Sequence, residues 1–328
     1  MATARDLRRR WARRWLPWLA AAGLFAWLLA RVPVGALRDA LRDSLRQGAW
    51  LPVVVWALIA TVAVLPLDAF ATREALAIAG LSRGCREILL VRGASYLLGL
   101  VSYVAGQGGV GIWLAKSGAR AARAAGAMLF LMVSNGIALV LLAALGLLAD
   151  LPGERRELLL WLTAGAIAGI ALYLAVIASR VRWLAGRAAL APLFAAGLAG
   201  HLRAAAARLP HLVVMAGLQW AAFRAWGLAV PFWRGLALML VVLLVGALPV
   251  TPSGLGTSQV LQVLLFSPWS PATTAAARGA DVLALSLVYS VSGLLWQAAV
   301  GVVCLAVLRR DGRGDDGDSA SGAVAEGP

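Results

Sequence analysis

The sequence predicts an all-α, polytopic membrane protein with about six full spans and two re-entrant helical hairpins in an inverted-topology repeat. Three observations predict this class. Of the 328 residues, 62% are hydrophobic and 14% are charged, whereas about 25% of the residues in a soluble domain are charged. Residues 235–277 carry no charge, and as one helix they would measure about 65 Å, twice the roughly 30 Å of a hydrocarbon core. Basic residues flank most apolar segments, as membrane topology requires.

The formal net charge of +15 comes almost entirely from arginine, with Lys116 as the only lysine. A strongly basic chain can bind nucleic acid, but these arginines lie beside apolar segments, where they set orientation and contact anionic lipid. We therefore expect membrane lipids as partners and no nucleic acid. Cys85 and Cys304 have neither metal-ligand spacing nor the number that a disulfide framework needs, so no metal site is predicted.

The N-terminal region predicts an uncleaved first span. Six arginines in residues 1–15 precede the apolar residues 16–30. No small-x-small cleavage motif follows, so we expect this segment to remain as a helix with residues 1–15 in the cytoplasm. Leu37, Leu41 and Leu45 then recur at helical spacing among charged residues, which predicts a short amphipathic helix on the outer surface.

Five further segments are long and apolar enough to cross a bilayer. They are residues 49–67, 124–149, 158–179, 212–230 and 282–308.

The connections differ in charge. Arg180, Arg182, Arg187, Arg203 and Arg208 predict a long basic loop before the span at residues 212–230. Residues 309–328 are small, polar and acidic, a composition that predicts a disordered cytoplasmic tail.

Two apolar segments, at about residues 88–118 and 235–268, contain glycine-rich interruptions. If both are re-entrant hairpins, 20 basic residues lie on the cytoplasmic side and 8 outside. If the first segment crosses fully, the numbers become 13 inside and 15 outside; if only the second crosses, they are 18 and 10. The preference for cytoplasmic arginine and lysine therefore favours two re-entrant hairpins, strongly for the first and modestly for the second.

This topology divides the chain into two membrane repeats, residues 16–149 and 150–308. The first hairpin enters from the cytoplasm and the second from outside, so the halves are topological mirror images, as in many transporters. Their glycine motifs lie about 145 residues apart, which suits a two-fold repeat. Little residue identity relates the halves, so the repeat is inferred from topology. We expect the protein to lie in the cell (inner) membrane, with both termini in the cytoplasm.

Non-helical backbone at membrane depth must be buried in protein or line a wet cavity. In each hairpin the second arm starts near the midplane, so its helix N-terminus presents unpaired N–H groups that attract phosphate or carboxylate. The predicted substrate-binding residues in the two turns are Gly106, Gln107, Gly108, Gly109 and Gly111, and Pro249, Thr251, Pro252, Ser253, Gly254, Gly256, Thr257 and Gln259. Glycine also allows close packing of membrane helices, which is the alternative interpretation of the first motif.

Two arginines lie inside predicted membrane segments, where a charge usually faces a cavity or a partner. Arg92 is placed about one turn inside its helix, so it either binds an anion or reaches the cytoplasmic surface. Arg224 is deeper, and we expect it to contact a phosphate or carboxylate. Asp68, near the inner end of its helix, is expected to pair with an arginine or carry a proton, with pairing favoured. Asn135 is expected to join helices.

The second hairpin carries a family resemblance. Residues 248–259 resemble the Pro-x-(Ser/Thr)-Pro-Gly-Gly-Leu-Gly-x-x-Glu signature of the lysylphosphatidylglycerol synthase transmembrane region family, the flippase-like membrane proteins. Residues 103–118 and the helix after them are similar to that family's earlier glycine motif. The sequence departs from the signature at Gln259, where the family has glutamate, and at Ser253. The first motif also lacks the family's proline and Gly-Glu. The resemblance implies that a lipid or lipid-linked substrate moves between leaflets.

We therefore expect a flippase-like protein of the inner membrane that translocates or binds an anionic lipid or lipid-linked headgroup. The alternative is a non-transporting membrane subunit that scaffolds a lipid or glycan synthase, which the departures from the family glutamates favour. A membrane-embedded transferase is less favoured because no metal cluster, His-carboxylate pair or nucleophile-base arrangement lies in the helices. No enzymatic activity and no cofactor are predicted.

Overall fold

The structure is a computed structural model that describes residues 4–144, 153–247, 251 and 254–322. All regular structure in this part of the chain is helical, which confirms the predicted all-α class. The elements are α1 (Ala4–Arg31), α2 (Val34–Gln47), α3 (Trp50–Ile78), α4 (Cys85–Gly99), α5 (Tyr103–Lys116), α6 (Ala121–Ala144), α7 (Gly153–Ala178), α8 (Arg182–Ala185), α9 (Ala191–Trp226), α10 (Phe232–Gly246), α11 (Thr257–Phe266), the 3-10 helix η3 (Ser267–Trp269) and α12 (Ala275–Gly322).

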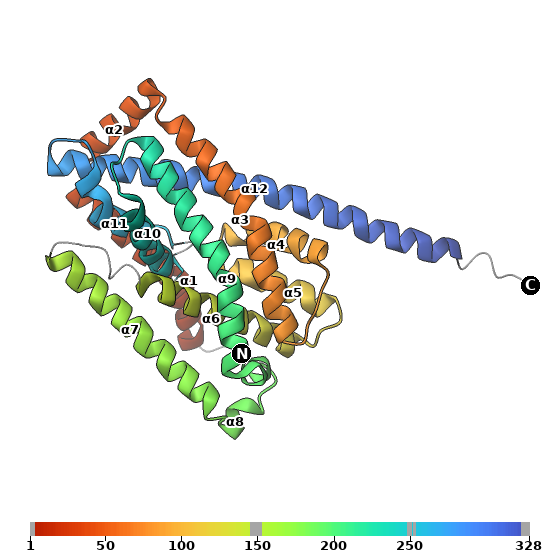
Figure 1. The fold of residues 1–328 in the computed structure, drawn as a ribbon. Helices are drawn as coiled ribbons and strands as arrows, with labels where there is room; N and C mark the ends of the chain where they lie inside the picture. The colour runs from red at the N-terminus through yellow and green to blue at the C-terminus, as the bar shows by residue number, and fades with distance from the viewer. Residues whose placement is uncertain (1–3, 145–152, 248–250, 252–253, 323–328) are drawn as a thin grey trace, which may run out of the picture.

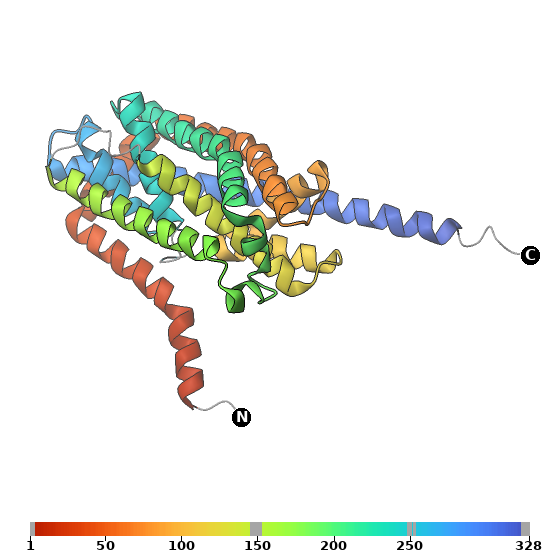
Figure 2. The ribbon, with the colours of Figure 1, turned by 60° about the horizontal axis from the view of Figure 1, so that its bottom comes forward.

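The bundle is built around α3, α6, α9 and α12 (Figure 1). Helix α9 packs against α3 and α6, and α12 packs against α4 and α3. Helix α7 lies along one edge of the bundle, and the far end of α12 projects beyond it. Figure 2 shows the first part of α1 leaning away from the other helices.

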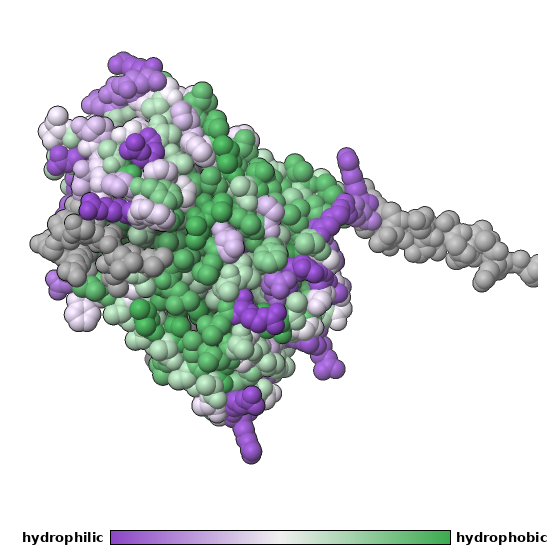
Figure 3. Space-filling view, viewed as in Figure 1, coloured by the Kyte–Doolittle hydropathy of each residue, from purple (hydrophilic) through white to green (hydrophobic). Residues whose placement is uncertain are grey.

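Four described helical segments are long and apolar enough to cross a bilayer: Trp50–Ile78, Ala121–Ala144, Leu159–Ala178 and Ala275–Asp311. A fifth is possible if the bent pair Trp18–Arg31 and Val34–Gln47, at 88° to each other, forms one span. Figure 3 shows a broad apolar belt with polar residues gathered at its two ends. The chain is thus a multi-pass helical membrane protein.

The segment predicted to cross at residues 212–230 belongs to α9, which is not among the helices that pass this test in the described chain. Helix α9 starts at Ala191, inside the predicted basic loop, has a kink at Gly197 and contains Pro210. It buries His201, Arg208 and His211. Because His201 bonds to Tyr173 and Arg208 pairs with Asp68 inside the protein, the helix need not be uniformly apolar to lie in the bundle.

The amphipathic helix predicted from Leu37, Leu41 and Leu45 is confirmed as α2. Residues 309–328 were predicted to be a disordered tail, but α12 continues as helix to Gly322. Residues 323–328 lie outside the described part of the chain. Extending an existing helix costs less than starting one, which is the physical reason that the helix runs past Arg309.

The first hairpin is formed by α4 and α5, which pack against each other. The chain leaves helical geometry at residues 100–102, not at the glycine motif, which lies inside α5. Ser102 is the N-cap of α5 and its side chain accepts a hydrogen bond from Ala105 N at 3.0 Å. A serine cap satisfies a backbone N–H that the helix leaves unpaired, so the turn forms at Ser102.

The glycines of that motif serve mainly helix packing. A Cβ on Gly106 would lie 3.1 Å from the Cα of Gly99 on α4. A Cβ on Gly109 would lie 2.8 Å from Leu98, and one on Gly111 3.1 Å from Met128 of α6. These contacts agree with the alternative interpretation of the motif, in which small residues let helices approach closely.

The second hairpin is formed by α10 and α11, and the interval between these helices, residues 247–256, contains the predicted Pro-Gly segment; its described residues, 247, 251 and 254–256, belong to neither α-helix. Gly254 and Gly256 have φ of +72° and +89°, which L side chains rarely adopt. A Cβ on Gly256 would lie 3.2 Å from Leu24 Cβ, so α1 packs directly on this turn. Pro249, Pro252 and Ser253 lie outside the described residues.

The two hairpins open toward opposite ends of the bundle. At one end, Arg83 Nη2 donates to Ser117 O at 2.9 Å, and Arg86 pairs with Asp311 of α12. These contacts gather the outer ends of α4 and α5 with the late part of α12. At the other end, Ala229 N donates to Trp269 O at 3.0 Å, which joins the outer ends of α10 and α11.

Candidate functional site

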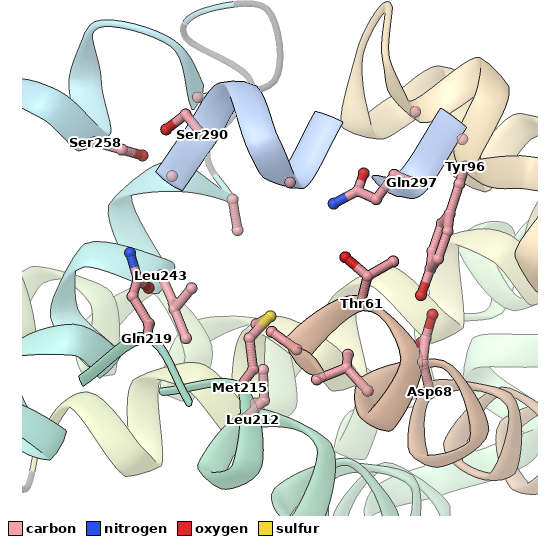
Figure 4. Close-up of a pocket in the computed structure, with 18 of the residues that line it drawn as sticks. Thr61, Asp68, Tyr96, Leu212, Met215, Gln219, Leu243, Ser258, Ser290 and Gln297 are labelled. Atoms are coloured by element: carbon pink, nitrogen blue, oxygen red, sulfur yellow. The ribbon is translucent and has the colours of Figure 1, made fainter. Parts of the chain in front are cut away.

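A cavity of about 400 Å³ lies between the helices, within the size range of small-molecule sites. Eight helices line it: α3, α4, α5, α6, α9, α10, α11 and α12. The turns of both hairpins border the cavity, with Gly99 and Gly106 from the first and Gly246 and Gly254 from the second. Figure 4 shows side chains from several of these helices pointing into it.

A buried ion cluster forms part of the cavity wall. The Asp68 carboxylate accepts hydrogen bonds from two arginines: Arg92 Nε donates to Oδ2 at 2.9 Å, and Arg208 Nη1 donates to Oδ1. All three side chains are at most 7% exposed. The pairing of Asp68 with an arginine, which the sequence favoured, is therefore confirmed.

The three ions come from helices that are far apart in the sequence. Asp68 lies on α3 ten residues before the end of that helix, so it is about 15 Å from the helix terminus. Arg92 lies two turns inside α4. Both positions are deeper than predicted, because α3 continues to Ile78 and α4 starts at Cys85. A position inside the bundle, with a carboxylate as partner, excludes the alternative in which Arg92 extends to the cytoplasmic surface.

The cluster contains two guanidinium groups and one carboxylate, so its charged side chains sum to +1. Burying an ion is costly unless it is paired, and a buried pair replaces part of the lost hydration. Arg92 Nη1 also donates to Gln107 Oε1 at 3.2 Å, which extends the network onto the first turns of α5. A site with surplus positive charge in an apolar bundle attracts an anion, since Coulomb interactions strengthen when water is excluded.

Two further groups lie beside the cluster. His211 follows Arg208 by less than one turn of α9, is 8% exposed and lines the cavity. Its Nδ1 has no hydrogen-bond partner among the described residues. Figure 4 shows the Tyr96 hydroxyl and the Asp68 carboxylate pointing toward each other across one end of the cavity.

At the second hairpin, Gln259 closes the N-terminus of α11. Its Oε1 accepts a hydrogen bond from Gly256 N at 2.7 Å, and its Nε2 donates to Ser290 Oγ of α12 at 3.2 Å. Thr257 Oγ1 donates to Gly254 O at 2.9 Å. The side chain of Gln259 thus satisfies one N–H of the helix N-terminus and fixes the turn against α12.

The cavity brings together five of the predicted site residues: Arg92, Gly106, Gln107, Gly254 and Gln259. Seven others are described but are not on its wall: Gly108, Gly109, Gly111, Arg224, Thr251, Gly256 and Thr257.

Arg224, predicted to contact an anion inside the membrane, has a different place in the structure. It lies in the last turn of α9, its side chain is exposed, and its Nη1 donates to Leu228 O at 3.0 Å. Because α9 ends two residues later, Arg224 lies at the surface end of the helix, and the cavity wall does not include it.

Sequence reasoning missed several polar residues of the cavity, chiefly on α9. Arg208 was assigned to a loop, and His211 and Gln219 were given no role. A signal was present: Arg208, His211, Met215 and Gln219 are spaced three or four residues apart, which places them on one face of a helix. All four line the cavity.

No protein-family model matches the chain, and no curated protein matches it. Within the described residues, no group of three or more histidine, cysteine, aspartate or glutamate side chains is arranged to hold a metal ion.

Proposed function

We propose that this membrane protein binds the anionic headgroup of a lipid in the central cavity and moves it between the two leaflets. The observation that carries the proposal is the buried cluster of Arg92, Asp68 and Arg208 on the cavity wall, with one more positive than negative charge. A lipid phosphate supplies the missing negative charge and further acceptors for the guanidinium groups.

The position of the hairpins supports movement as well as binding. Their turns border one cavity although they enter the bundle from opposite ends. In the proposed inverted-topology repeat, one half rocks against the other around a fixed site, so the cavity opens to each side in turn. With the outer ends of α4 and α5 in the cytoplasm, both termini are cytoplasmic, in agreement with the distribution of basic residues.

The proposal also agrees with the resemblance of residues 248–259 to the flippase-like family. No nucleotide-binding motif was found in the sequence, so transport would draw on an ion gradient or on consumption of the lipid at its destination.

A reconstituted assay tests the proposal. The purified chain is placed in liposomes that contain acyl-chain-labelled fluorescent phosphatidylglycerol or phosphatidylcholine, and dithionite quenching reports the label that reaches the outer leaflet. The native protein should translocate phosphatidylglycerol faster. Arg208→Gln should slow it at least tenfold, because hydrogen bonds to charged groups contribute about 1.5–3 kcal/mol.

The matched control is Arg203→Gln, since Arg203 is an exposed arginine on the same helix. It should leave the rate unchanged. Asp68→Asn provides a test of opposite sign: it removes the carboxylate that competes with the anion, so the protein should retain anionic lipid more tightly. An unchanged phosphatidylglycerol rate in a folded Arg208→Gln protein would refute the proposed anion contact.

A second candidate is a non-transporting subunit that holds lipid beside a lipid or glycan synthase. Residues 232–268, which include the second hairpin, contain no acidic residue, and Gln259 is engaged in bonds to Gly256 and Ser290. This hairpin therefore offers no carboxylate to couple transport to protons. Stoichiometric co-purification of an enzyme, together with no lipid movement by the isolated chain, would favour this candidate.

A further inference from the structure

Carboxamide side chains are concentrated on the cavity wall. The whole sequence contains six glutamines and one asparagine. Only Gln47, exposed at the end of α2, lies elsewhere. The other six line the cavity: Gln107, Asn135, Gln219, Gln259, Gln262 and Gln297.

Carboxamides often join helices in membrane proteins, but that role accounts for only two of these six. Gln107 bonds to Arg92, and Gln259 bonds to Gly256 and Ser290. The side chains of Asn135, Gln219, Gln262 and Gln297 make no hydrogen bond to any other described residue. Gln262 Oε1 is fully buried without a partner.

Unpaired amides inside an apolar bundle are costly. A buried donor or acceptor without a partner costs about 1–3 kcal/mol, and buried polar groups in native proteins are nearly always paired. This cost applies to the buried Gln262 Oε1, which a partner that fills the cavity would satisfy together with the other carboxamides that line it. Each carboxamide offers both hydrogen-bond donors and an acceptor. Hydroxyl groups also donate and accept, so they can pair with both parts of a carboxamide.

Gln219 is separated from the anion cluster, whereas Gln297 lies beside Tyr96 at the end that holds the cluster. Figure 4 shows Asp68 and Tyr96 at one end of the cavity and Gln219, Ser258 and Ser290 at the other. Along α9, Arg208 and Gln219 are eleven residues apart, or about 16 Å. The apolar side chains of Leu212 and Met215 lie between the two ends, and Leu243 lies beside Gln219. A phosphate held by the arginines would leave the amide end unfilled.

We infer that the cavity binds a lipid headgroup with two parts, an anionic phosphate at Arg92 and Arg208 and a neutral hydroxylated ring, such as a hexose or inositol, beside Gln219 and Gln262. This inference rests on the proposed function and specifies its substrate class. The ring hydroxyls pair the amides, and the phosphate balances the surplus charge of the buried cluster.

Native mass spectrometry of the full-length protein tests the inference with three lipids added in equal amounts. Phosphatidylinositol has a phosphodiester and a hydroxylated ring, phosphatidylethanol has the same phosphodiester without hydroxyls, and phosphatidylcholine has no net charge. The native protein should retain phosphatidylinositol over phosphatidylethanol by at least about tenfold, and phosphatidylethanol over phosphatidylcholine.

The variants separate the two ends of the cavity. Gln219→Leu and Gln262→Leu preserve side-chain size, and each should reduce the preference for phosphatidylinositol over phosphatidylethanol by about fivefold or more while leaving phosphatidylethanol binding unchanged. Gln47→Leu, the exposed glutamine, should change neither. Arg208→Gln should weaken both anionic lipids together.

The outcomes distinguish the two proposals. Equal retention of phosphatidylinositol and phosphatidylethanol, with both weakened by Arg208→Gln, would overturn this inference and leave the anion site intact. Retention of neither above phosphatidylcholine would overturn the proposed function. Displacement of phosphatidylinositol by an equal concentration of soluble inositol 1-phosphate would overturn the lipid part of the inference and assign the site to a soluble sugar phosphate.

Discussion

Arg208 of α9 and Asp68 of α3, 140 residues apart in the sequence, form an ion pair inside the helical bundle. The carboxylate is shared, because Arg92 of α4 donates to its other oxygen. One acidic side chain thus holds three helices together at a wall of the cavity. All three side chains line the cavity.

The shared carboxylate should matter strongly for stability. Asp68→Ala leaves two buried guanidinium groups without their partner, so it should lower the free energy of unfolding by about 3–5 kcal/mol. Adding Arg208→Met to Asp68→Ala should restore part of the loss, since one unpaired charge is removed. Unfolding temperatures in detergent for the single and double variants measure this coupling.

The control for that experiment is Asp311→Ala, which breaks the exposed pair with Arg86. Exposed ion pairs contribute about 0–1 kcal/mol, so the unfolding temperature should change little. If Asp68→Ala were as mild as Asp311→Ala, the buried pairing would not hold the helices.

The two neighbouring glycines of α5 should respond in opposite directions to alanine. Gly106→Ala places a methyl group 3.1 Å from the Cα of Gly99, and forcing helices apart typically costs about 1–3 kcal/mol. Gly108 has nothing within 4 Å of an added Cβ. Gly108→Ala should therefore stabilise α5 by about 0.5–1 kcal/mol through helix propensity.

Thermal unfolding of both variants checks this prediction, with the native chain as reference. Equal shifts for Gly106→Ala and Gly108→Ala would show that α4 and α5 do not pack at Gly106.

The cap formed by Gln259 should tolerate glutamate and not leucine. Gln259→Leu removes the acceptor for Gly256 N and the donor to Ser290, and loss of a helix cap costs about 0.5–2 kcal/mol. Gln259→Glu keeps an acceptor for Gly256 N, and the Ser290 hydroxyl can reverse and donate to the carboxylate. A negative charge is also favourable at a helix N-terminus.

The readout is the unfolding temperature, with Ser290→Ala as the variant that removes only the second bond. A larger loss for Gln259→Glu than for Gln259→Leu would contradict the capping role.

Asp281 should stabilise the contacts between helices at the end of the bundle where α10 and α11 have their outer ends. Its carboxylate accepts hydrogen bonds from Trp226 Nε1 at 2.7 Å and Ser270 Oγ at 2.5 Å, so it joins α9, the segment after η3 and α12. Asp281→Ala should cost about 2–4 kcal/mol, because each hydrogen bond to a charged group contributes about 1.5–3 kcal/mol.

Ser270→Ala should cost less, since Trp226 keeps its acceptor. Limited proteolysis between residues 226 and 275 measures the loosening directly, and equal protection of native protein and Asp281→Ala would contradict the prediction.

Local signals in the sequence predicted the second hairpin well. Gly254 and Gly256 adopt a positive φ that L side chains rarely adopt, within an uncharged run too long for one span. The segment predicted as the first hairpin contains the helix pair α4 and α5, but the prediction assigned the turn to the glycines instead of Ser102. In the sequence, a glycine at position 106 is equally consistent with a turn and with close helix packing. Only the contact with Gly99 in the structure distinguishes the two interpretations.

Composition and charge distribution by themselves determined that this protein is a helical membrane protein with interrupted segments, because apolar length and glycine conformation are properties of short stretches of chain. The positions of Arg208, His211 and Gln219 on the cavity wall were decided only by tertiary structure. A charge or amide is stable inside a bundle only if partners from other helices surround it, and the partner of Arg208 lies 140 residues away on α3. No local sequence pattern predicts a partner that far away in the chain.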